Sequence, residues 1–292
     1  MYKVQLQHSF LRLTNKARYT TLIRKNFLKQ VLIMREIISD RIVIKVGTST
    51  LTKATGELNM ARIQALTHTI AKLKNQGKQI ILVTSGAIGV GTAKLNLAKR
   101  PTLIPEKQAV AAVGQSLLMG VYDKYFSVHN FAVGQVLITK DCIDHTRRYG
   151  NAINTLNSLL NLGVIPIVNE NDTVAVDEII FGDNDTLSAY VATMINANLL
   201  IILSDIDGLY DKDPSEPGAA LISEVVKITD AIKESAGGAG SAYGTGGMAT
   251  KLEAATIAAQ NGTKTIITNG EKVGQLEAIL NGERIGTYFD LK

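Results

Sequence analysis

Apolar and polar positions along this chain predict strands and helices that follow one another in turn. Short, nearly continuous runs of aliphatic residues are typical of strands buried on both faces of a parallel sheet. Longer segments, in which apolar residues recur every three or four positions, are typical of helices that pack on one face. The strands are predicted at residues 41–46, 79–84, 132–138, 164–169, 199–204 and 264–268, and the helices at 60–76, 107–125, 151–162, 185–196 and 252–260.

This order of elements predicts an α/β fold with a mainly parallel sheet. Strands that alternate with helices pair in parallel through right-handed crossovers, which place helices on both faces of the sheet. A hairpin is expected at residues 174–181, with Asp177 and Glu178 at its turn. A looser seam between an N-terminal and a C-terminal half is expected near residues 181–187.

The first 35 residues differ in charge from the rest of the chain. They contain eight of the 31 Lys and Arg residues and no acid, which leaves 23 basic against 26 acidic residues in positions 36–292. The net charge of +5 therefore reflects this segment and gives no support to a nucleic-acid partner for the main domain. The chain has no Trp, and aromatic residues make up only 5% of it, which disfavours a stacking platform for single-stranded nucleic acid.

Residues 1–35 are interpreted as a basic extension outside the fold, and residues 36–292 as one domain. The extension lacks the apolar core of a secretory signal, and its Ser content is low for a transit peptide. We favour an upstream extension, with a natural start at Met34. A single cysteine, Cys142, excludes an internal disulfide and favours a cytoplasmic location. No apolar run is long enough to span a bilayer, so a membrane partner is not expected.

A glycine-rich turn before a predicted helix is the first candidate for chemistry. Residues 244–251 read Gly-Thr-Gly-Gly-Met-Ala-Thr-Lys and precede an Ala-rich segment. Backbone N–H groups at a helix start bind anions, and Lys251 adds a mobile positive charge. The spacing is not that of a Walker A loop, and an ordinary helix-capping loop explains the glycines equally well.

Small polar, glycine and acidic residues follow the predicted strands, at the edge where ligands bind in parallel α/β sheets. They include the runs 47–49, 85–87, 169–172 and 204–205. The recurrence of such residues at each strand end is harder to explain by loops alone.

Lys45 and the run Gly182-Asp183-Asn184-Asp185 each allow two interpretations. Lys45 interrupts an apolar strand, so its charge requires a counter-charge or water. It is either an edge-strand lysine that reaches solvent or a lysine directed at a phosphate. The run at 182–185 either caps a helix or supplies an acid that holds the two lysines and an Asn that contacts a substrate.

Six runs in order resemble the motifs of the glutamate 5-kinases, a group within the amino acid kinase family. The match extends from about Arg41 to Phe289, which makes it far more specific than one glycine loop. The runs are Ile-Lys-Val-Gly-Thr-Ser at 44–49, Val-Thr-Ser-Gly-Ala-Ile at 83–88, Ala-Val-Gly-Gln-Ser at 112–116, Asn-Glu-Asn-Asp at 169–172, Gly-Asp-Asn-Asp at 182–185, and residues 244–251.

The resemblance implies a three-layer αβα fold and transfer of a phosphoryl group from ATP, with Mg²⁺, to the side-chain carboxylate of L-glutamate. This reaction is the first step of proline synthesis. Lys45 and Lys251, oriented by Asp185, are expected to flank the transferred group. The expected glutamate contacts are Ser85, Asp172 and Asn184, and the expected ATP contacts are Lys45, Ser204, Asp205, Thr245, Gly246, Gly247, Met248, Ala249, Thr250 and Lys251.

The resemblance also carries expectations about partners and domains. The half up to about residue 181 is expected to bind the acceptor and the other half ATP, with Mg²⁺ mainly on the ATP phosphates and no metal site in the protein. Proline is expected as a feedback inhibitor, and a homo-oligomer, dimer or tetramer, as the assembly. Two features depart from the family pattern. Many members carry a C-terminal RNA-modification-type (PUA) domain, for which a chain that stops at Lys292 is too short, and the extension before Met34 has no counterpart.

Three other functions stay open at this point. Another carboxylate, carbamate or nucleoside-monophosphate kinase of the same fold would share much of the pattern. A non-catalytic nucleotide- or amino-acid-binding regulator is disfavoured, because Lys45, Asp185 and Lys251 occur together. A nicotinamide dehydrogenase is disfavoured by the glycine spacing of residues 86–91.

The residues of the chain suit a carboxylate acceptor. Such an acceptor is already ionised at neutral pH, with an ordinary pKa of about 4.3, and needs no general base. The lack of a clear catalytic His or Cys is therefore expected, and Cys142 with His145 is interpreted as an incidental pair.

Overall fold

The computed structural model describes residues 34–53, 55–175, 184–236 and 247–291. In these ranges eight strands form one sheet, in the order β3-β4-β2-β1-β5-β7-β8-β6. Neighbouring strands pair in parallel, except that β7 and β8 are antiparallel. The strands are β1 (Arg41–Val46), β2 (Gln79–Val83), β3 (Val133–Ile138), β4 (Ile165–Glu170), β5 (Leu199–Ser204), β6 (Glu224–Val225), β7 (Lys264–Asn269) and β8 (Thr287–Phe289).

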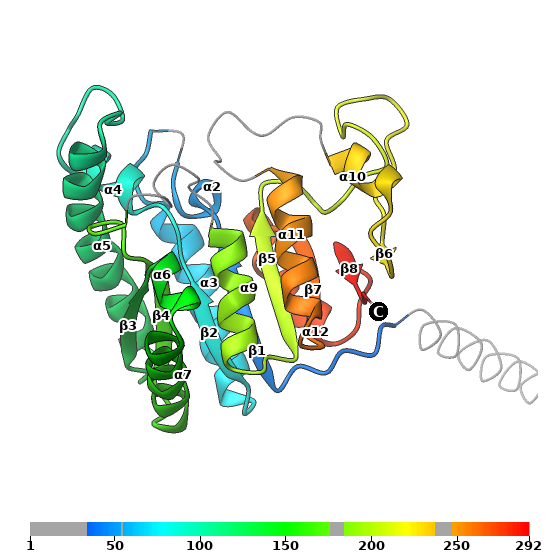
Figure 1. Ribbon diagram of the computed structural model, residues 1–292, viewed down its shortest axis with the longest axis horizontal. Coiled ribbons are helices and arrows are strands. Elements are labelled where there is room, and N and C mark those ends of the chain that lie inside the picture. Colours follow the sequence, from blue (N-terminus) through cyan, green and yellow to red (C-terminus); the bar gives the residue numbers. More distant parts are fainter. Residues whose placement is uncertain (1–33, 54, 176–183, 237–246, 292) are drawn as a thin grey trace, which may run out of the picture.

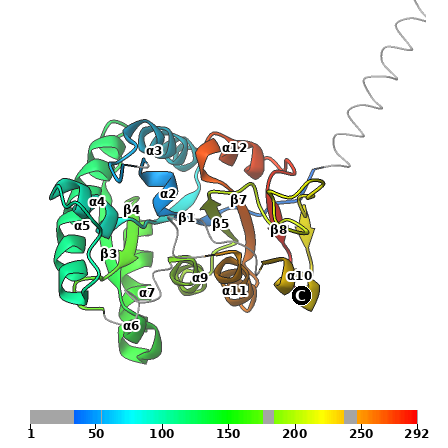
Figure 2. The same ribbon diagram turned by 90° about the horizontal axis from the view of Figure 1, so that it is seen from above.

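Helices cover both faces of this sheet, which gives three layers. Figure 2 shows α3 and α12 on one face and α7, α9 and α11 on the other, while α4 and α5 lie toward the β3 end of the sheet. The helices are α2 (Thr48–Leu51), α3 (Met60–Asn75), α4 (Ala87–Lys94), α5 (Ile104–Ser127), α6 (Lys140–Asp144), α7 (Thr146–Asn161), α9 (Asn184–Met194), α10 (Asp230–Ala236), α11 (Met248–Ala259), the 3-10 turn η1 (Gly270–Lys272) and α12 (Gln275–Leu280). None of these helices is both long and apolar enough to cross a bilayer.

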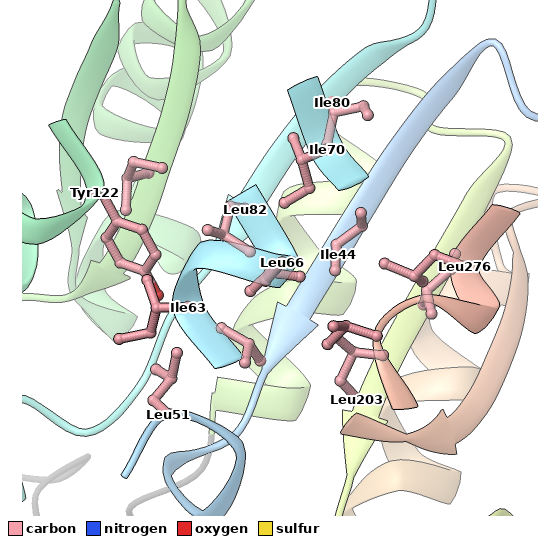
Figure 3. Packing of buried hydrophobic residues seen from close by; sticks show 14 of the residues in the cluster. Ile44, Leu51, Ile63, Leu66, Ile70, Ile80, Leu82, Tyr122, Leu203 and Leu276 are labelled. Atoms are coloured by element: carbon pink, nitrogen blue, oxygen red, sulfur yellow. The ribbon is translucent and has the colours of Figure 1, made fainter. Parts of the chain in front are cut away.

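Alternation along the strands divides the buried side chains into two cores. In β1, Ile42, Ile44 and Val46 join the core under α3 and α5, whereas Val43 joins the core under α9 and α11. Figure 3 shows Ile44 in the first core among Leu66, Ile70 and other aliphatic side chains. Successive strand residues point to opposite faces, so Lys45 shares the face of Val43.

The structure confirms the predicted α/β fold with its mainly parallel sheet. All six predicted strands are present, at bounds within two residues of those expected. Helix α7 begins at Thr146, five residues earlier than expected, and α11 begins at Met248 rather than at residue 252. The hairpin expected at 174–181, apart from Val174 and Ala175, lies outside the described residues. The expected seam does not interrupt the sheet, because β1 pairs directly with β5 across the two halves.

The N-terminal boundary of the folded part lies before Arg35, not after it as the charge pattern suggested. Arg35 is buried, and its guanidinium donates to the carbonyl oxygens of Ser223, Ile285 and Gly286 at 2.5, 3.0 and 3.2 Å. It also lies over the Tyr288 ring, 5.4 Å from the centroid. A cation in a carbonyl cluster of this kind belongs to the domain, although its charge made it look like the rest of the extension.

Candidate active site at the carboxyl ends of the strands

Lys45 lies in the middle of the sheet. Its strand β1 is paired on both sides, with Lys45 opposite Val83 of β2 and Ile202 of β5. The alternative of an edge-strand lysine is therefore wrong, and the side chain is only 6% exposed. A cation buried at this position requires a partner of opposite charge.

Asp185 supplies that partner. It is the second residue of α9, which packs beside α11 on the face toward which Lys45 points (Figure 1), and it is fully buried. One carboxylate oxygen forms an ion pair with Lys45, and the other lies 3.1 Å from the Nζ atom of Lys251. The hydroxyl of Thr250 adds a hydrogen bond of 3.2 Å to the second oxygen. Two cations from distant parts of the chain thus share one buried carboxylate.

The electrostatics keep this carboxylate ionised. Burial by itself raises the pKa of Asp185, but the positive charges of Lys45 and Lys251 and their hydrogen bonds outweigh burial and lower the pKa below its ordinary value. The cluster therefore carries two positive charges against one negative charge. Two basic side chains beside a helix start suit an anionic ligand.

The first turn of α11 contains several of the residues predicted to contact ATP. Gly247 precedes the helix and has no side chain with which to cap it, so the N–H groups of the first turn point out of the helix start. Lys251 lies within this first turn, 6% exposed and held by Asp185, so the expectation of a mobile charge is wrong. Met248, Ala249 and Thr250 are in place in the same turn, whereas Thr245 and Gly246 lie outside the described residues.

Ser204 and Asp205 follow the end of β5. Ser204 is buried on the same face of the sheet as Lys45, and its hydroxyl donates to the Asp205 carboxylate at 3.1 Å. Asp205 itself is exposed. Since β5 is the direct neighbour of β1, this pair stands at the same sheet edge as the two lysines.

Asn184, the residue before Asp185, is one of the three residues predicted to contact the acceptor. Its Nδ2 atom lies 2.5 Å from the Thr84 carbonyl, 2.7 Å from Asn169 Oδ1 and 3.2 Å from Ser85 Oγ. The structure thus brings the predicted residues Ser85 and Asn184 together. Asp172 lies in the turn after β4 and is partly buried, so it stands at the end of the strand that supplies Asn169.

Sequence reasoning placed Asn169, Thr84 and Gln115 in the polar and motif runs 169–172, 83–88 and 112–116, but gave none of the three a role of its own. Asn169 is 2% exposed and donates to Gln115 Oε1 at 2.8 Å. A signal was present, because Gln115 occupies the buried stripe of α5 formed with Ala111, Leu118 and Tyr122. Asn169 likewise continues the inward alternation of Ile165 and Ile167.

Cys142 and His145 give no sign of nucleophilic chemistry. Cys142 is half-buried beside a cavity of about 630 Å³ that Lys140, Asp141 and Arg148 also line. Burial raises the pKa of its thiol, which lowers the thiolate fraction at neutral pH.

The described residues offer few side chains that could hold a metal ion of their own. Among them, no group of three or more His, Cys, Asp or Glu side chains could hold a metal ion. Both oxygens of the Asp185 carboxylate already face lysines. Mg²⁺ commonly takes most of its ligands from phosphates and water, so its coordination by ATP stays a prediction.

The fold and site together define an α/β protein with a buried pair of lysines that share one carboxylate at the carboxyl edge of a mainly parallel sheet. Residues 40–269 match the model of the amino acid kinase family. The chain belongs to the amino acid kinase family. The resemblance inferred from the sequence is thereby confirmed, as is the assignment to the kinases.

Relatives and solved structures agree with this family. The chain is 53% identical over 266 residues to a glutamate 5-kinase of Clostridium perfringens, covering 89% of this chain and 99% of the relative. It is also 53% identical over 250 residues to a glutamate 5-kinase of a Thermoanaerobacter species, covering 85% and 67%. A carbamate kinase from Giardia lamblia bound to AMP-PNP superposes with a TM-score of 0.62 at 14% identity, over 87% of this chain and 99% of that one, which shows a shared fold.

Proposed function

We propose that this protein transfers the γ-phosphoryl group of ATP to the side-chain carboxylate of L-glutamate and so forms glutamyl 5-phosphate for proline synthesis. The main structural support for this proposal is the pair of buried lysines, Lys45 and Lys251, that share the Asp185 carboxylate near the end of β1. The identity of more than half to glutamate 5-kinases selects glutamate among the acceptors that this fold serves.

The reaction needs neither a covalent bond to the protein nor a general base. A carboxylate oxygen of glutamate attacks the γ-phosphorus, an O–P bond forms, and the bond from phosphorus to the β,γ-bridging oxygen breaks. The electron pair of that bond leaves with ADP, and no proton moves. Catalysis then consists of alignment and stabilisation of charge on the transferred group.

The cation pair meets that requirement. Lys45 comes from β1 and Lys251 from α11, so the two ammonium groups approach the moving phosphoryl group from separate elements. Asp185 holds both side chains in place without taking part in proton transfer. The N–H groups at the start of α11 bind phosphate oxygens, together with residues 245–247. When bound with ATP, Mg²⁺ would neutralise part of the phosphate charge.

Asn184 gives the acceptor site its polarity. Its Nδ2 atom lies within hydrogen-bond distance of the Thr84 carbonyl, Asn169 Oδ1 and Ser85 Oγ, so its Oδ1 oxygen is the group that we assign to the ligand. An acceptor oxygen suits the ammonium group of an amino acid, while Ser85 and Asp172 complete the contacts to glutamate. Ser204 and Asp205 contact the nucleotide.

The family resemblance supports three further properties. Proline acts as a feedback inhibitor, the protein assembles as a homo-oligomer, and it works in the cytoplasm. Size-exclusion chromatography with light scattering, with and without proline, measures the second property directly.

A comparison of acceptors tests the proposed function. Purified protein is given ATP and Mg²⁺ with L-glutamate, N-acetylglutamate or L-aspartate, and ADP release is followed with hydroxylamine present to trap an acyl phosphate. We expect ADP and trapped product with glutamate, at a rate well above the other two. Equal rates with all three acceptors, or a preference for another one, would overturn the assignment of glutamate.

A further inference from the structure

Three carboxamide side chains form a continuous chain of hydrogen bonds across the carboxyl edge of the sheet. Asn184, at the start of α9, donates to Asn169 Oδ1 at 2.7 Å, and Asn169 donates to Gln115 Oε1 at 2.8 Å. All three side chains are buried or nearly so. Gln115 belongs to α5, which packs on the first core, and Asn184 to α9, which packs on the second, so these hydrogen bonds connect the two faces of the sheet.

The direction of these hydrogen bonds is fixed at one end. Asn184 also donates to the backbone carbonyl of Thr84 at 2.5 Å, and a carbonyl oxygen can only accept. The Thr84 side chain is itself held by the Tyr122 hydroxyl at 2.8 Å. The amide orientation of Asn184 therefore sets that of Asn169, which in turn sets that of Gln115.

A contribution to folding stability does not explain why the last residue of this hydrogen-bond series is a glutamine. The Nε2 atom of Gln115 is buried without a hydrogen-bond partner, and a buried unpaired donor is unfavourable. Its neighbours on the inner stripe of α5, Ala111, Leu118 and Tyr122, join the hydrophobic core. What Gln115 provides is a single acceptor oxygen for Asn169.

We propose that Gln115 is a positioning residue for the acceptor site. By accepting from Asn169, it holds that carboxamide with Oδ1 toward Asn184, which then keeps its own Oδ1 directed at the acceptor. If Gln115 Oε1 is removed, the Asn169 carboxamide loses the acceptor that holds it. Asn184 then keeps its bond to the Thr84 carbonyl but loses a fixed second acceptor. This inference rests on the proposed function only in its assignment of Asn184 to the glutamate site.

The test compares Gln115→Leu, which removes the acceptor oxygen at similar volume, with Gln115→Glu, which retains one. Ser116→Ala, on the exposed side of the same helix, serves as the matched control. For Gln115→Leu we expect the glutamate KM to rise about tenfold, as for loss of one buried polar contact, while the ATP KM stays within about twofold. Gln115→Glu should lie closer to the parent protein, and Ser116→Ala should equal it.

A second measurement needs no turnover and therefore separates this inference from the proposed function. In the ligand-free protein, the side-chain amide resonances of Asn184 and Asn169 should shift in Gln115→Leu and stay near their original positions in Gln115→Glu. Unchanged resonances in Gln115→Leu would overturn the positioning role. An equal rise of both KM values together with a lower Tm would also overturn it, because it would indicate a general loss of structure.

Discussion

At the scale of single residues, the site depends on one buried carboxylate between two lysines. Removal of one partner from a buried ion pair leaves uncompensated charge, which typically costs about 3–5 kcal/mol. We expect Asp185→Asn to lower the free energy of unfolding at pH 7 by an amount in this range. Asp230→Asn removes an exposed partner of Lys233 and should cost less than about 1 kcal/mol, so it is the control. Urea unfolding measures both.

The same carboxylate predicts a pH dependence. The pKa of Asp185 is lower in the folded protein than its ordinary value of 3.8, so its contribution is complete above about pH 4 and is lost as the pH falls through the folded value. The difference in stability between the parent protein and Asp185→Asn should therefore shrink below about pH 4. A difference that stays constant down to pH 3 would contradict the assigned ion pairs.

From the sequence, roles could be assigned to residues whose charge or context is unusual. Asn169 and Gln115 lay in the quoted runs but received no role, because only their position in the fold is unusual. A lysine in an apolar strand and an acid at a helix start are visible without a structure. Asn169 and Gln115 are ordinary residue types, and their roles follow from the meeting of β4 with α5, which no local pattern specifies. Their positions on inward-facing stripes were the available signal.

At the scale of elements, the close crossing of α4 and α5 places Ser85 and Gln115. A Cβ atom on Gly114 would lie 1.8 Å from the Ala87 carbonyl oxygen, and one on Gly91 would lie 2.0 Å from the Val110 carbonyl oxygen. These contacts involve backbone on both sides, so neither can be relieved by a side-chain movement. The two glycines therefore set how near the two helices approach each other.

We expect Gly114→Ala to push the two helices apart and to destabilise the fold by about 1–3 kcal/mol, the usual range for overpacking. The glutamate KM should rise as well, because Ser85 and Gln115 flank the contact. Gly120→Ala on the same helix meets nothing within 4 Å and should be neutral or slightly stabilising. Thermal unfolding and the two KM values test this pair, and equal effects of both substitutions would argue against the crossing as the cause.

The bounds of helices and strands were predicted well where buried apolar residues follow one another without a gap, and poorly where polar or exposed residues intervene. The central strands are apolar along nearly their whole length, so their bounds were nearly correct. The first turn of α7 is polar and exposed, which hid its start, and the short strands β6 and β8 were not predicted. Short edge elements derive their structure from neighbours more than from their own pattern.

At the scale of the whole molecule, Arg35 connects the start of the folded part to the segments around β6 and β8 by hydrogen bonds. Its guanidinium satisfies three backbone carbonyl groups at positions 223, 285 and 286. We expect Arg35→Ala to lower stability by about 1.5–3 kcal/mol, because buried carbonyl groups lose a charged donor. Deletion of residues 1–33, which are interpreted as an extension outside the fold, should change stability by less than about 0.5 kcal/mol. A large loss from the deletion would show that the extension packs on the domain.

The central claim is that Lys45 and Lys251 act on the transferred phosphoryl group. The most direct measurement is kcat for Lys45→Ala, determined together with the Kd for ATP. Charge on the phosphoryl oxygens grows toward the transition state, so loss of a fixed cation should affect kcat more than binding. We expect kcat to fall about a hundredfold or more, with Kd changed only a few-fold and little rescue by Lys45→Arg. A near-normal kcat in a folded Lys45→Ala protein would contradict the account and leave Lys45 with a structural role alone.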